Sequence, residues 1–358
     1  MMKEMSYREL SDSAVELLKL LIATQSFSGE EARVADIMNH FLTSRGIKTQ
    51  RYLNNVWALN DDFDASKPTI LLNSHLDTVR PNTGYTRNPF EPAVEGDKLY
   101  GLGSNDAGGC LVSLAATFTF FYAQKGLKYN IVFAATAEEE NSGKNGLECV
   151  LPLLPPISFA IVGEPTQMHL AVAEKGLMVL DCIAHGKSGH AARNEGVNAI
   201  FRAIEDIEWF NSYRFPKVSD YLGEVKMSVT MINAGTQHNV VPDRCSYVVD
   251  VRLTDSYSLE EVFETVKQHV KSDVSCRSMR LRPSKIDIAH PIVQAGIALG
   301  RTTYGSPTTS DQALVDAPSL KLGPGDSARS HTADEFVHLS EIHEGVELYI
   351  KMLNKVVL

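Results

Sequence analysis

Three short apolar runs constrain the fold of this chain more than any other feature of its sequence. Residues 69–74 (TILLNS), 130–135 (NIVFAA) and 159–162 (FAIV) are apolar at successive positions, and a helical pattern at residues 108–124 lies between the first two. Strands that are apolar on both faces are typical of sheets covered on both sides, and such sheets are mostly parallel. We therefore predict an α/β fold with a mostly parallel central sheet.

The length of the chain predicts more than one domain. Its 358 residues exceed the ~250–300 residues at which a single hydrophobic core stops growing. Between residues 171 and 285 the pattern changes to strand, helix, strand, strand, helix, strand, the order of a ferredoxin-like α+β sandwich. We predict a larger domain of residues 1–173 and 287–358 that encloses an inserted domain of residues 174–286.

The individual elements follow from the same periodicity. Helices of the larger domain are predicted at residues 11–23, 30–45 and 340–356. The six elements of the inserted domain are predicted at residues 175–184, 197–210, 225–233, 246–253, 259–272 and 279–286.

The composition excludes some classes of binding partner and indicates the cellular compartment. The 34 Lys and Arg residues against 44 Asp and Glu residues give a net charge of −10, which disfavours a nucleic-acid partner. The longest apolar stretch, residues 111–123, is too short to span a membrane, and the opening segment MMKEMSYREL does not read as a secretory signal. Five cysteines without CxxC spacing disfavour disulfides and a thiolate site. We expect a soluble, cytoplasmic protein.

Acidic residues and one histidine follow the apolar runs. The residues at these strand exits are His75, Asp77, Asp106, Glu138, Glu139, Glu140 and Glu164. The carboxyl ends of parallel strands face the ligand crevice of an open α/β sheet, and carboxylates gathered there repel one another unless a cation compensates them. Imidazole nitrogen with carboxylate oxygen, and no cysteine, suits zinc, with cobalt or manganese as substitutes.

Each of these residues also has an ordinary structural explanation. Asp106 precedes a helical pattern and could cap it, Asp77 could be a turn residue, and the glutamate triplet could be a solvated loop. The excess of acids could serve solubility alone. His75 and Asp77, however, point to the same side of a strand end, where Asp77 could accept the ring N–H of a metal-bound histidine. The conjunction favours a metal site.

Five segments, in order along the chain, carry a family resemblance. They are residues 71–79 (LLNSHLDTV), 101–106 (GLGSND), 138–140 (EEE), 163–165 (GEP) and 323–336, which includes GPG and HTADEF. They resemble the M20 metallopeptidase family, nearest to its branch of acetylornithine deacetylase and succinyl-diaminopimelate desuccinylase, and within that branch to acetylornithine deacetylase. The resemblance implies a zinc-peptidase-like catalytic domain with an inserted ferredoxin-like lid and dimerisation domain.

The resemblance also implies a ligand set for two zinc ions. Asp106 would bridge the two ions, His75 and Glu164 would complete one site, and Glu140 and His331 would complete the other. Asp77 would support the site as a catalytic residue.

Two neighbouring residues of the glutamate triplet are candidates for the general base. Glu139 would be the base in the frame that we prefer, but the family triplet is Asp-Glu-Glu, and sliding the frame would make Glu138 the base and Glu139 a ligand. A second departure lies after Asp106, where Gly108 stands at a position at which the family commonly has lysine.

Substrate contacts are implied in both domains. His190, in a segment that resembles one that reaches the active site of the partner subunit, would stabilise the reaction intermediate. Asn239 and Arg252 would contact the substrate, with Arg252 suited to a carboxylate, although a salt bridge with Asp250 or Asp255 explains it equally well. The predicted substrate-facing loops also contain Ser310, Gly323 and Gly325, where the glycines would present bare backbone N–H groups.

The expected activity is the metal-dependent hydrolysis of an N-acyl amino acid. N-acetylornithine or N-acetylcitrulline, hydrolysed to acetate and the free amino acid in arginine biosynthesis, is the first expectation. Succinyl-diaminopimelate desuccinylase and dipeptidase activities stay open, as does a catalytically silent metal- or metabolite-binding protein. The resemblance further implies a homodimer formed through the lid domain.

Overall fold

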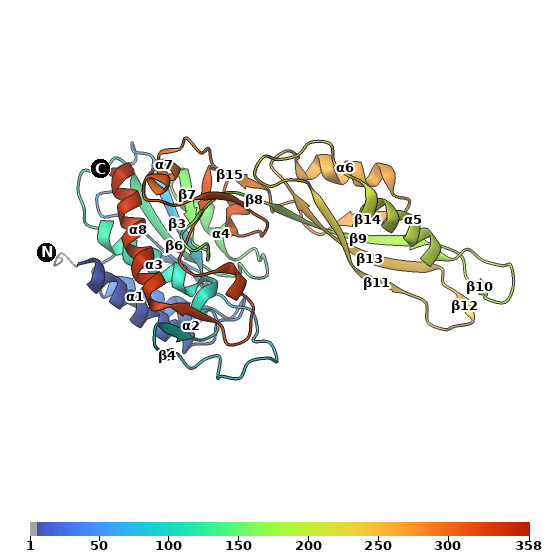
Figure 1. The fold of residues 1–358 in the computed structure, drawn as a ribbon, viewed down its shortest axis with the longest axis horizontal. Helices are drawn as coiled ribbons and strands as arrows, with labels where there is room; N and C mark the ends of the chain where they lie inside the picture. The colour runs from blue at the N-terminus through green and yellow to red at the C-terminus, as the bar shows by residue number, and fades with distance from the viewer. Residues whose placement is uncertain (1–5) are drawn as a thin grey trace. The chain divides into compact units, whose positions relative to one another are not determined.

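The computed structural model describes residues 6–358, so the first half of the opening segment examined for a secretory signal lies outside the described residues. The chain divides into two compact units, each drawn in Figure 1. Unit 1 runs to Val172 and includes Lys285–Tyr304 and Ser310–Leu358, and unit 2 consists of Ala173–Ser284 and Gly305–Thr309. Unit 2 differs from the predicted inserted domain of residues 174–286 by one residue at its start, by two at its end and by the short return of Gly305–Thr309.

A nine-stranded sheet, whose last strands run into the boundary with unit 2, forms the centre of unit 1. Its order is β1-β2-β6-β3-β7-β17-β8-β15, with β16 beside β8. The strands are β1 (Thr49–Tyr52), β2 (Asn55–Leu59), β3 (Thr69–His75), β6 (Asn130–Thr136), β7 (Ile157–Val162), β8 (Leu170–Glu174), β15 (Ser284–Lys285), β16 (Thr303–Ser306) and β17 (Ser319–Lys321). The four central strands β6, β3, β7 and β17 are parallel, whereas β1 and β2 form an antiparallel edge. The predicted α/β class with a mostly parallel sheet is confirmed.

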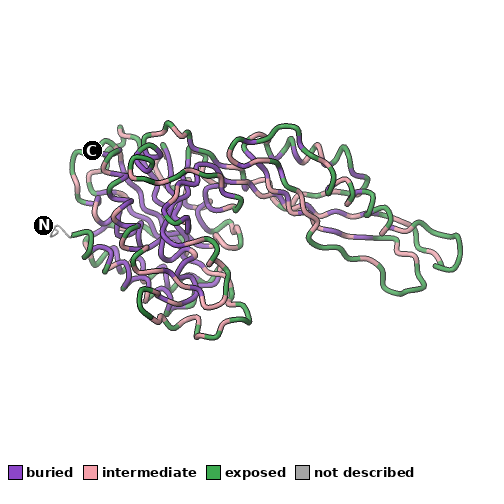
Figure 2. The backbone as a smooth tube through the Cα atoms, viewed as in Figure 1, coloured by how far each residue is buried: buried purple, intermediate pink, exposed green. Residues whose placement is uncertain are grey.

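Helices cover both faces of this sheet. The helices of unit 1 are α1 (Tyr7–Ile22), α2 (Ala32–Thr43), α3 (Gly109–Phe121), α4 (Leu147–Val150), α7 (Pro291–Ala298) and α8 (Leu339–Val357). Helices α1, α3, α7 and α8 pack together on one face, with α3 against β3 and β6, and α3 is buried on nearly all sides, as Figure 2 shows. Residues of α4 close the other face around Trp57 and Leu71. The central strands are therefore covered on both sides, which explains their continuous apolar runs.

Local signals set the helix ends. Helix α1 begins at Tyr7, earlier than the predicted residue 11, because Ser6 and Glu9 form a capping box. A small sheet of β4 (Ala93–Glu95), β5 (Lys98–Tyr100) and β18 (Phe336–His338) lies beside the main one. Among the described residues, no helix combines the length and the apolar composition of a membrane span.

Unit 2 is a four-stranded antiparallel sheet, in the order β11-β13-β9-β14, with two helices. The elements are β9 (Gly176–His185), α5 (Ala199–Ser212), β11 (Lys226–Ala234), β13 (Arg244–Leu253), α6 (Leu259–His269) and β14 (Asp273–Cys276), with a two-stranded ribbon of β10 (Gly189–His190) and β12 (Val240–Val241). Burial alternates along β9 and β13, so one face of the sheet packs on the helices and the other faces solvent.

The last predicted strand of the inserted domain is wrong. We expected a strand at residues 279–286, but β14 lies at Asp273–Cys276 and pairs with β9. Residues 279–286 contain Pro283, which has no N–H to donate to a strand ladder, and only Ser284 and Lys285 are extended, as β15 of the other sheet.

Candidate metal centre

The parallel strands of unit 1 bring distant acidic residues to one edge of the sheet. His75 lies opposite Thr136 in the β3–β6 register, and Asn73 lies opposite Val162 in the β3–β7 register. The residues that follow β6 and β7 therefore lie next to the end of β3. Within the described residues, two sets of side chains bring their ligand atoms within 4.8 Å of one another: His75 with Asp106 and Glu140, and His75 with Glu139 and Glu164.

Asp106 lies between two histidines. Its Oδ1 is 3.4 Å from Nε2 of His75, and its Oδ2 is 3.6 Å from Nε2 of His331. Beyond Asp106, the Nε2 of His75 is 3.8 Å from Oε1 of Glu164, and the Nε2 of His331 is 3.0 Å from Oε2 of Glu140. The five side chains that the sequence assigns to two metal ions thus form one cluster, with one carboxylate oxygen of Asp106 beside each histidine.

The donor atoms of this cluster suit divalent cations. The buried Nε2 of His75 and Oε1 of Glu164 have no hydrogen-bond partner among the described residues, although buried polar atoms are normally paired. Imidazole nitrogens and carboxylate oxygens are ligands that zinc accepts. A bound cation would satisfy both atoms, so the residues fit the group that the sequence implies.

The shifted pKa values in the cluster also indicate that a cation belongs there. Burial raises the pKa of Glu164 to about 8, with the charge of Asp106 adding to the effect. Burial, together with the charges of Glu164 and Asp311, raises the pKa of Glu139 well above its usual range, against the opposing effect of His75. A hydrogen bond to Glu140 raises the pKa of His331 to about 9. Glu139 and Glu164 therefore hold protons more readily than free carboxylates do, unless a cation replaces the protons.

Asp77 contacts both the ring of His75 and the backbone of the glutamate triplet. The ring Nδ1 of His75 lies 2.8 Å from the main-chain oxygen of Asp77 and 3.5 Å from its Oδ1, so the carbonyl rather than the carboxylate is the nearer partner of the ring. The Asp77 carboxylate accepts the backbone N–H groups of Glu139 and Glu140, at 3.0 and 3.1 Å, and the hydroxyl of Ser28 at 2.6 Å. Asp77 therefore fixes the backbone of the glutamate triplet.

The first glutamate of the triplet lies outside the cluster. Glu138 has a positive φ of 56°, and its carboxylate accepts the backbone N–H and side-chain amide of Asn145 at 3.1 and 2.9 Å. Glu139 and Glu140, by contrast, point into the cluster. This geometry favours the frame in which Glu139 and Glu140 take the two roles.

The structure decides two points around Asp106, the possible helix cap and the departure at Gly108. Helix α3 begins with Gly108 at its N-cap position and has no side-chain cap, so Asp106 is not a helix cap. A Cβ atom at Gly108 would lie 2.4 Å from the main-chain oxygen of Gly103 and 2.6 Å from Leu18. This turn leaves no space for the lysine that the family commonly carries there.

Three buried carboxylates that support the site were not assigned from the sequence. Glu31 is fully buried and accepts the backbone N–H groups of Gly29 and Glu138. Asp311 accepts the hydroxyl of Thr136 at 2.9 Å, and Glu335 binds the turn that carries Asp106. Glu335 had a signal, because it lies inside the HTADEF segment, and so had Asp311, because it follows Ser310 in a predicted substrate-facing loop.

The predicted substrate loops of unit 1 are packed rather than open. The side chain of Ser310 accepts the N–H of Gln312. The N–H of Gly323 donates to the hydroxyl of Thr166 at 3.1 Å, so the expected bare donor at Gly323 is wrong. Gly325 has a φ of 92°, and a Cβ there would lie 2.5 Å from Oδ1 of Asn105. At both positions close packing explains the glycine.

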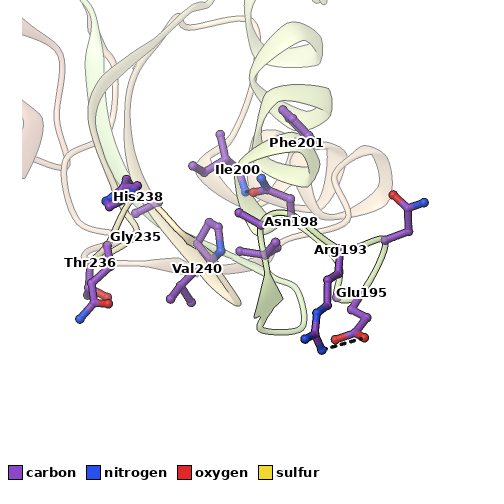
Figure 3. A pocket seen from close by; sticks show the side chains of 16 residues that line it. Arg193, Glu195, Asn198, Ile200, Phe201, Gly235, Thr236, His238 and Val240 are labelled. Carbon is purple, nitrogen blue, oxygen red and sulfur yellow. Dashed lines mark hydrogen bonds and ion pairs between the residues drawn. The ribbon is translucent and has the colours of Figure 1, made fainter.

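The other predicted substrate residues belong to unit 2. His190 lies on β10 and Asn239 directly precedes β12 of the same ribbon, where the N–H of Ala191 donates to the carbonyl of Asn239. The residues that follow them, Ala191 and Val240, line an open cavity of about 880 Å³ (Figure 3).

Arg252 makes the salt bridge that was the alternative to a substrate contact. Its Nε lies 2.8 Å from Oδ1 of Asp250, and it also donates to Oδ2 of Asp250 and to the hydroxyl of Thr309. The structure therefore shows the pairing of Arg252 with Asp250, and its contact with a substrate stays a prediction.

Comparison with known proteins identifies relatives over nearly the whole chain. The sequence signature of peptidase family M20/M25/M40 matches residues 71–355. The [LysW]-lysine/[LysW]-ornithine hydrolase of Sulfurisphaera tokodaii is 26% identical over 367 residues, covering 99% of this chain and 98% of the relative. The succinyl-diaminopimelate desuccinylase of Rickettsia bellii is 25% identical over 377 residues, covering 94% and 95%.

The fold of the chain is shared with a solved structure. The Bacillus subtilis YXEP protein, described as a dinuclear metal-binding peptidase of the M20 family, matches with a TM-score of 0.74 and 16% identity, over 98% of both chains. At this level of identity the match establishes the common fold.

Proposed function

The chain belongs to peptidase family M20/M25/M40 and is a metal-dependent hydrolase of that family, and from this membership we propose that its metal centre cleaves the amide bond of an N-acyl amino acid. The observation that carries the proposal is the position of Asp106, whose two carboxylate oxygens lie beside His75 and His331. A carboxylate shared in this way is the arrangement that a two-metal hydrolytic site needs.

We assign two zinc ions to this centre, with cobalt or manganese as substitutes. His75, Glu164 and one oxygen of Asp106 would hold the first ion, and His331, Glu140 and the other oxygen of Asp106 would hold the second. When bound, the pair of ions supplies Lewis acidity to a carbonyl group and lowers the pKa of a water molecule. The relative described as a dinuclear metal-binding peptidase supports this number of ions.

Glu139 is the proposed general base. It is the member of the triplet that points toward His75 and Glu164 without being needed to complete either ligand set. Its backbone is fixed by the Asp77 carboxylate, which holds the side chain in one place relative to the cluster. Glu139 would take a proton from the attacking water and return it to the nitrogen of the leaving amine.

The relatives point to a diamino acid as the leaving amine. Lysine, ornithine and diaminopimelate, which the names of the two sequence relatives contain, all carry a second amino group. N-acetylornithine is the simplest substrate of this kind and stays our first proposal, together with N-acetylcitrulline, which carries a ureido group in place of the second amino group. Such an activity fits cytoplasmic amino-acid biosynthesis, including that of arginine.

A panel of N-acyl amino acids tests this proposal. We expect metal-loaded protein to release free amine from at least one of N-acetylornithine, N-acetylcitrulline, N-succinyl-diaminopimelate and a dipeptide, and to release none after chelation. Amine release is measured with a fluorogenic reagent. Failure to hydrolyse any member under metal-replete conditions would contradict the hydrolase proposal and favour a silent metal-binding protein.

A second candidate rests on the Sulfurisphaera tokodaii relative. That protein matches across 98% of its own length, so hydrolysis of a LysW conjugate of lysine or ornithine is a specific alternative. Adding such a conjugate to the panel separates the two. Preference for the conjugate over the free N-acetyl amino acid would decide for this second activity.

Unit 2 supplies the proposed homodimer contact. Strand β11 is an edge strand of its sheet, and it exposes Met231 (64%) and Ile232 (56%), while the adjacent helix α5 exposes Phe201 (66%) and Ile204 (42%). Unpaired edges with exposed apolar side chains tend to pair with a second strand. A second copy that adds its own β11 would satisfy both features, and His190 would then belong to the partner-facing end of the unit.

Charges on this surface should therefore separate the subunits. We expect the double substitution Met231→Glu and Phe201→Glu to convert a dimer into a monomer, because two buried carboxylates on each side would face their copies. Light scattering coupled to size-exclusion chromatography measures the mass. Val218→Glu, at a residue of the same unit that is also exposed (57%), is the control, and an unchanged mass in the double variant would rule out this interface.

A further inference from the structure

Glu335 binds the turn that carries Asp106. Its side chain is almost completely buried, at 2% exposure. One oxygen accepts the backbone N–H groups of Asn105 and Asp106, at 2.8 and 2.9 Å, and the other accepts the N–H of Gly103 at 3.1 Å. One carboxylate therefore satisfies three backbone donors of a single turn. Neither glutamine nor alanine at this position would offer the same two acceptor oxygens.

Asp334, the preceding residue, binds a different loop. Its Oδ1 accepts the backbone N–H groups of Thr86 and Arg87, at 2.9 and 3.0 Å, and its Oδ2 accepts the hydroxyl of Thr86 at 2.5 Å. The same loop contacts the segment of His331, because Asn82 donates its side-chain amide to the carbonyl of His331 at 3.2 Å.

His331 needs such support. Its φ is 59°, a left-handed conformation that is unfavourable for a residue other than glycine. Its side chain is 56% exposed, so packing does not hold it. The conformation of His331 is therefore maintained by the loops around it, and Asp334 has a φ of 53° in the same turn.

We propose that Asp334 and Glu335 are positioning residues that join the His331 segment to the Asp106 turn. Glu335 fixes the backbone of Asp106, and Asp334 holds loop 82–87 against the segment of His331. Two adjacent carboxylates thus set the separation of ligands that come from places more than two hundred residues apart in the sequence. The expected effect of these residues on ion binding rests on the proposed metal centre. Their expected effect on the backbone rests on the hydrogen bonds alone.

Glu335→Gln should affect the whole centre. The amide offers one acceptor oxygen and turns two donors toward N–H groups, so the turn of Asp106 should loosen. We expect weaker binding of both ions, by about 10- to 100-fold each, as is common when the groups that orient metal ligands are replaced. We also expect faster amide hydrogen exchange at Gly103, Asn105 and Asp106 in the metal-free protein.

Asp334→Ala should affect one ion only. Because Asp334 supports the His331 segment and not the Asp106 turn, we expect weaker binding of the ion assigned to His331 and Glu140 and little change for the other. Chelator competition measures each affinity. Thr86→Val should reproduce part of this weakening, because it removes one hydrogen bond to Asp334. Thr86→Ser keeps that hydroxyl and should bind the ion as the wild type does.

The control and the contrary outcomes separate this inference from the proposed function. Glu95→Gln, which removes the surface ion pair with Arg87, should change neither exchange nor affinity. Unchanged exchange at the three amides in Glu335→Gln, or equal weakening of both ions in Asp334→Ala, would overturn the positioning role. If the wild-type chain binds no ion, the proposed function fails, and the exchange rates still decide whether Glu335 fixes the turn. If Glu335→Gln does not fold, the Thr86→Val and Thr86→Ser pair decides for Asp334.

Discussion

Replacing Glu139 by glutamine is expected to lower kcat by a factor of about 10² to 10⁴, the range typical of a general base, while both metal ions stay bound. Glutamine keeps the shape of the side chain but cannot accept a proton. Glu139 lies inside the cluster, with a carboxylate oxygen within 4.8 Å of the ligand atoms of His75 and Glu164, and burial raises its pKa in the metal-free protein. Steady-state kinetics and metal analysis of the same preparation measure the two effects.

Glu138→Gln is the matched control for this change. The Glu138 carboxylate is bound to Asn145 and lies outside the cluster, so we expect nearly unchanged kcat. Inactivation by Glu138→Gln with activity retained in Glu139→Gln would show that the frame is shifted by one residue. Loss of an ion in Glu139→Gln would make Glu139 a ligand instead of the base.

Replacing Asp106 by asparagine is expected to abolish turnover and to weaken both ions together. Asp106 places one carboxylate oxygen beside each histidine, so its loss removes a ligand from each proposed site. In the metal-free protein burial raises the pKa of Asp106, but the hydrogen bond and the charge of His75 outweigh burial and lower it. The ionised carboxylate therefore stabilises the metal-free fold, and the melting temperature of that form should fall or stay unchanged in the variant. The rise in melting temperature that added zinc gives the wild type should disappear, because stabilisation by a ligand depends on its affinity.

Differential scanning fluorimetry with and without zinc tests this second prediction. Asp61→Asn, at a surface ion pair with Lys125, should keep the full response to zinc. A normal zinc response in Asp106→Asn would contradict the bridging role of Asp106.

The convergence of the acidic residues could be predicted from the sequence because it follows from strand direction. Residues 69–74, 130–135 and 159–162 read as covered strands, and parallel strands end at the same edge. His75, Glu139, Glu140 and Glu164 therefore had to lie near one another once the three runs were parallel.

The position of His331 could not be predicted in this way. His331 lies in a loop with a left-handed backbone rather than at a strand end, and no periodicity leads to it, so its assignment came from the resemblance alone. The choice between Glu138 and Glu139 was also hidden, because it depends on the positive φ of Glu138 and on two backbone hydrogen bonds to Asp77.

Buried carboxylates that bind backbone groups cannot be recognised from the sequence either. Glu31 and Glu335 bind backbone N–H groups from segments distant in the chain, and such contacts leave no local pattern. The misplaced strand at residues 279–286 has a different cause, because Pro283 has no N–H for a strand ladder, whereas the apolar residues around it favour a strand. Tertiary contacts decide these features, and they appear only in the folded chain.

The central claim is that the cluster around Asp106 binds two ions and becomes hydrolytic when it does. Titration of the metal-free protein with zinc, following heat release and the hydrolysis of the best substrate of the panel in parallel, tests it most directly. The account predicts saturation at two ions per chain and activity that appears only as the sites fill. Equal activity before and after addition of zinc, or no saturable binding, would contradict it.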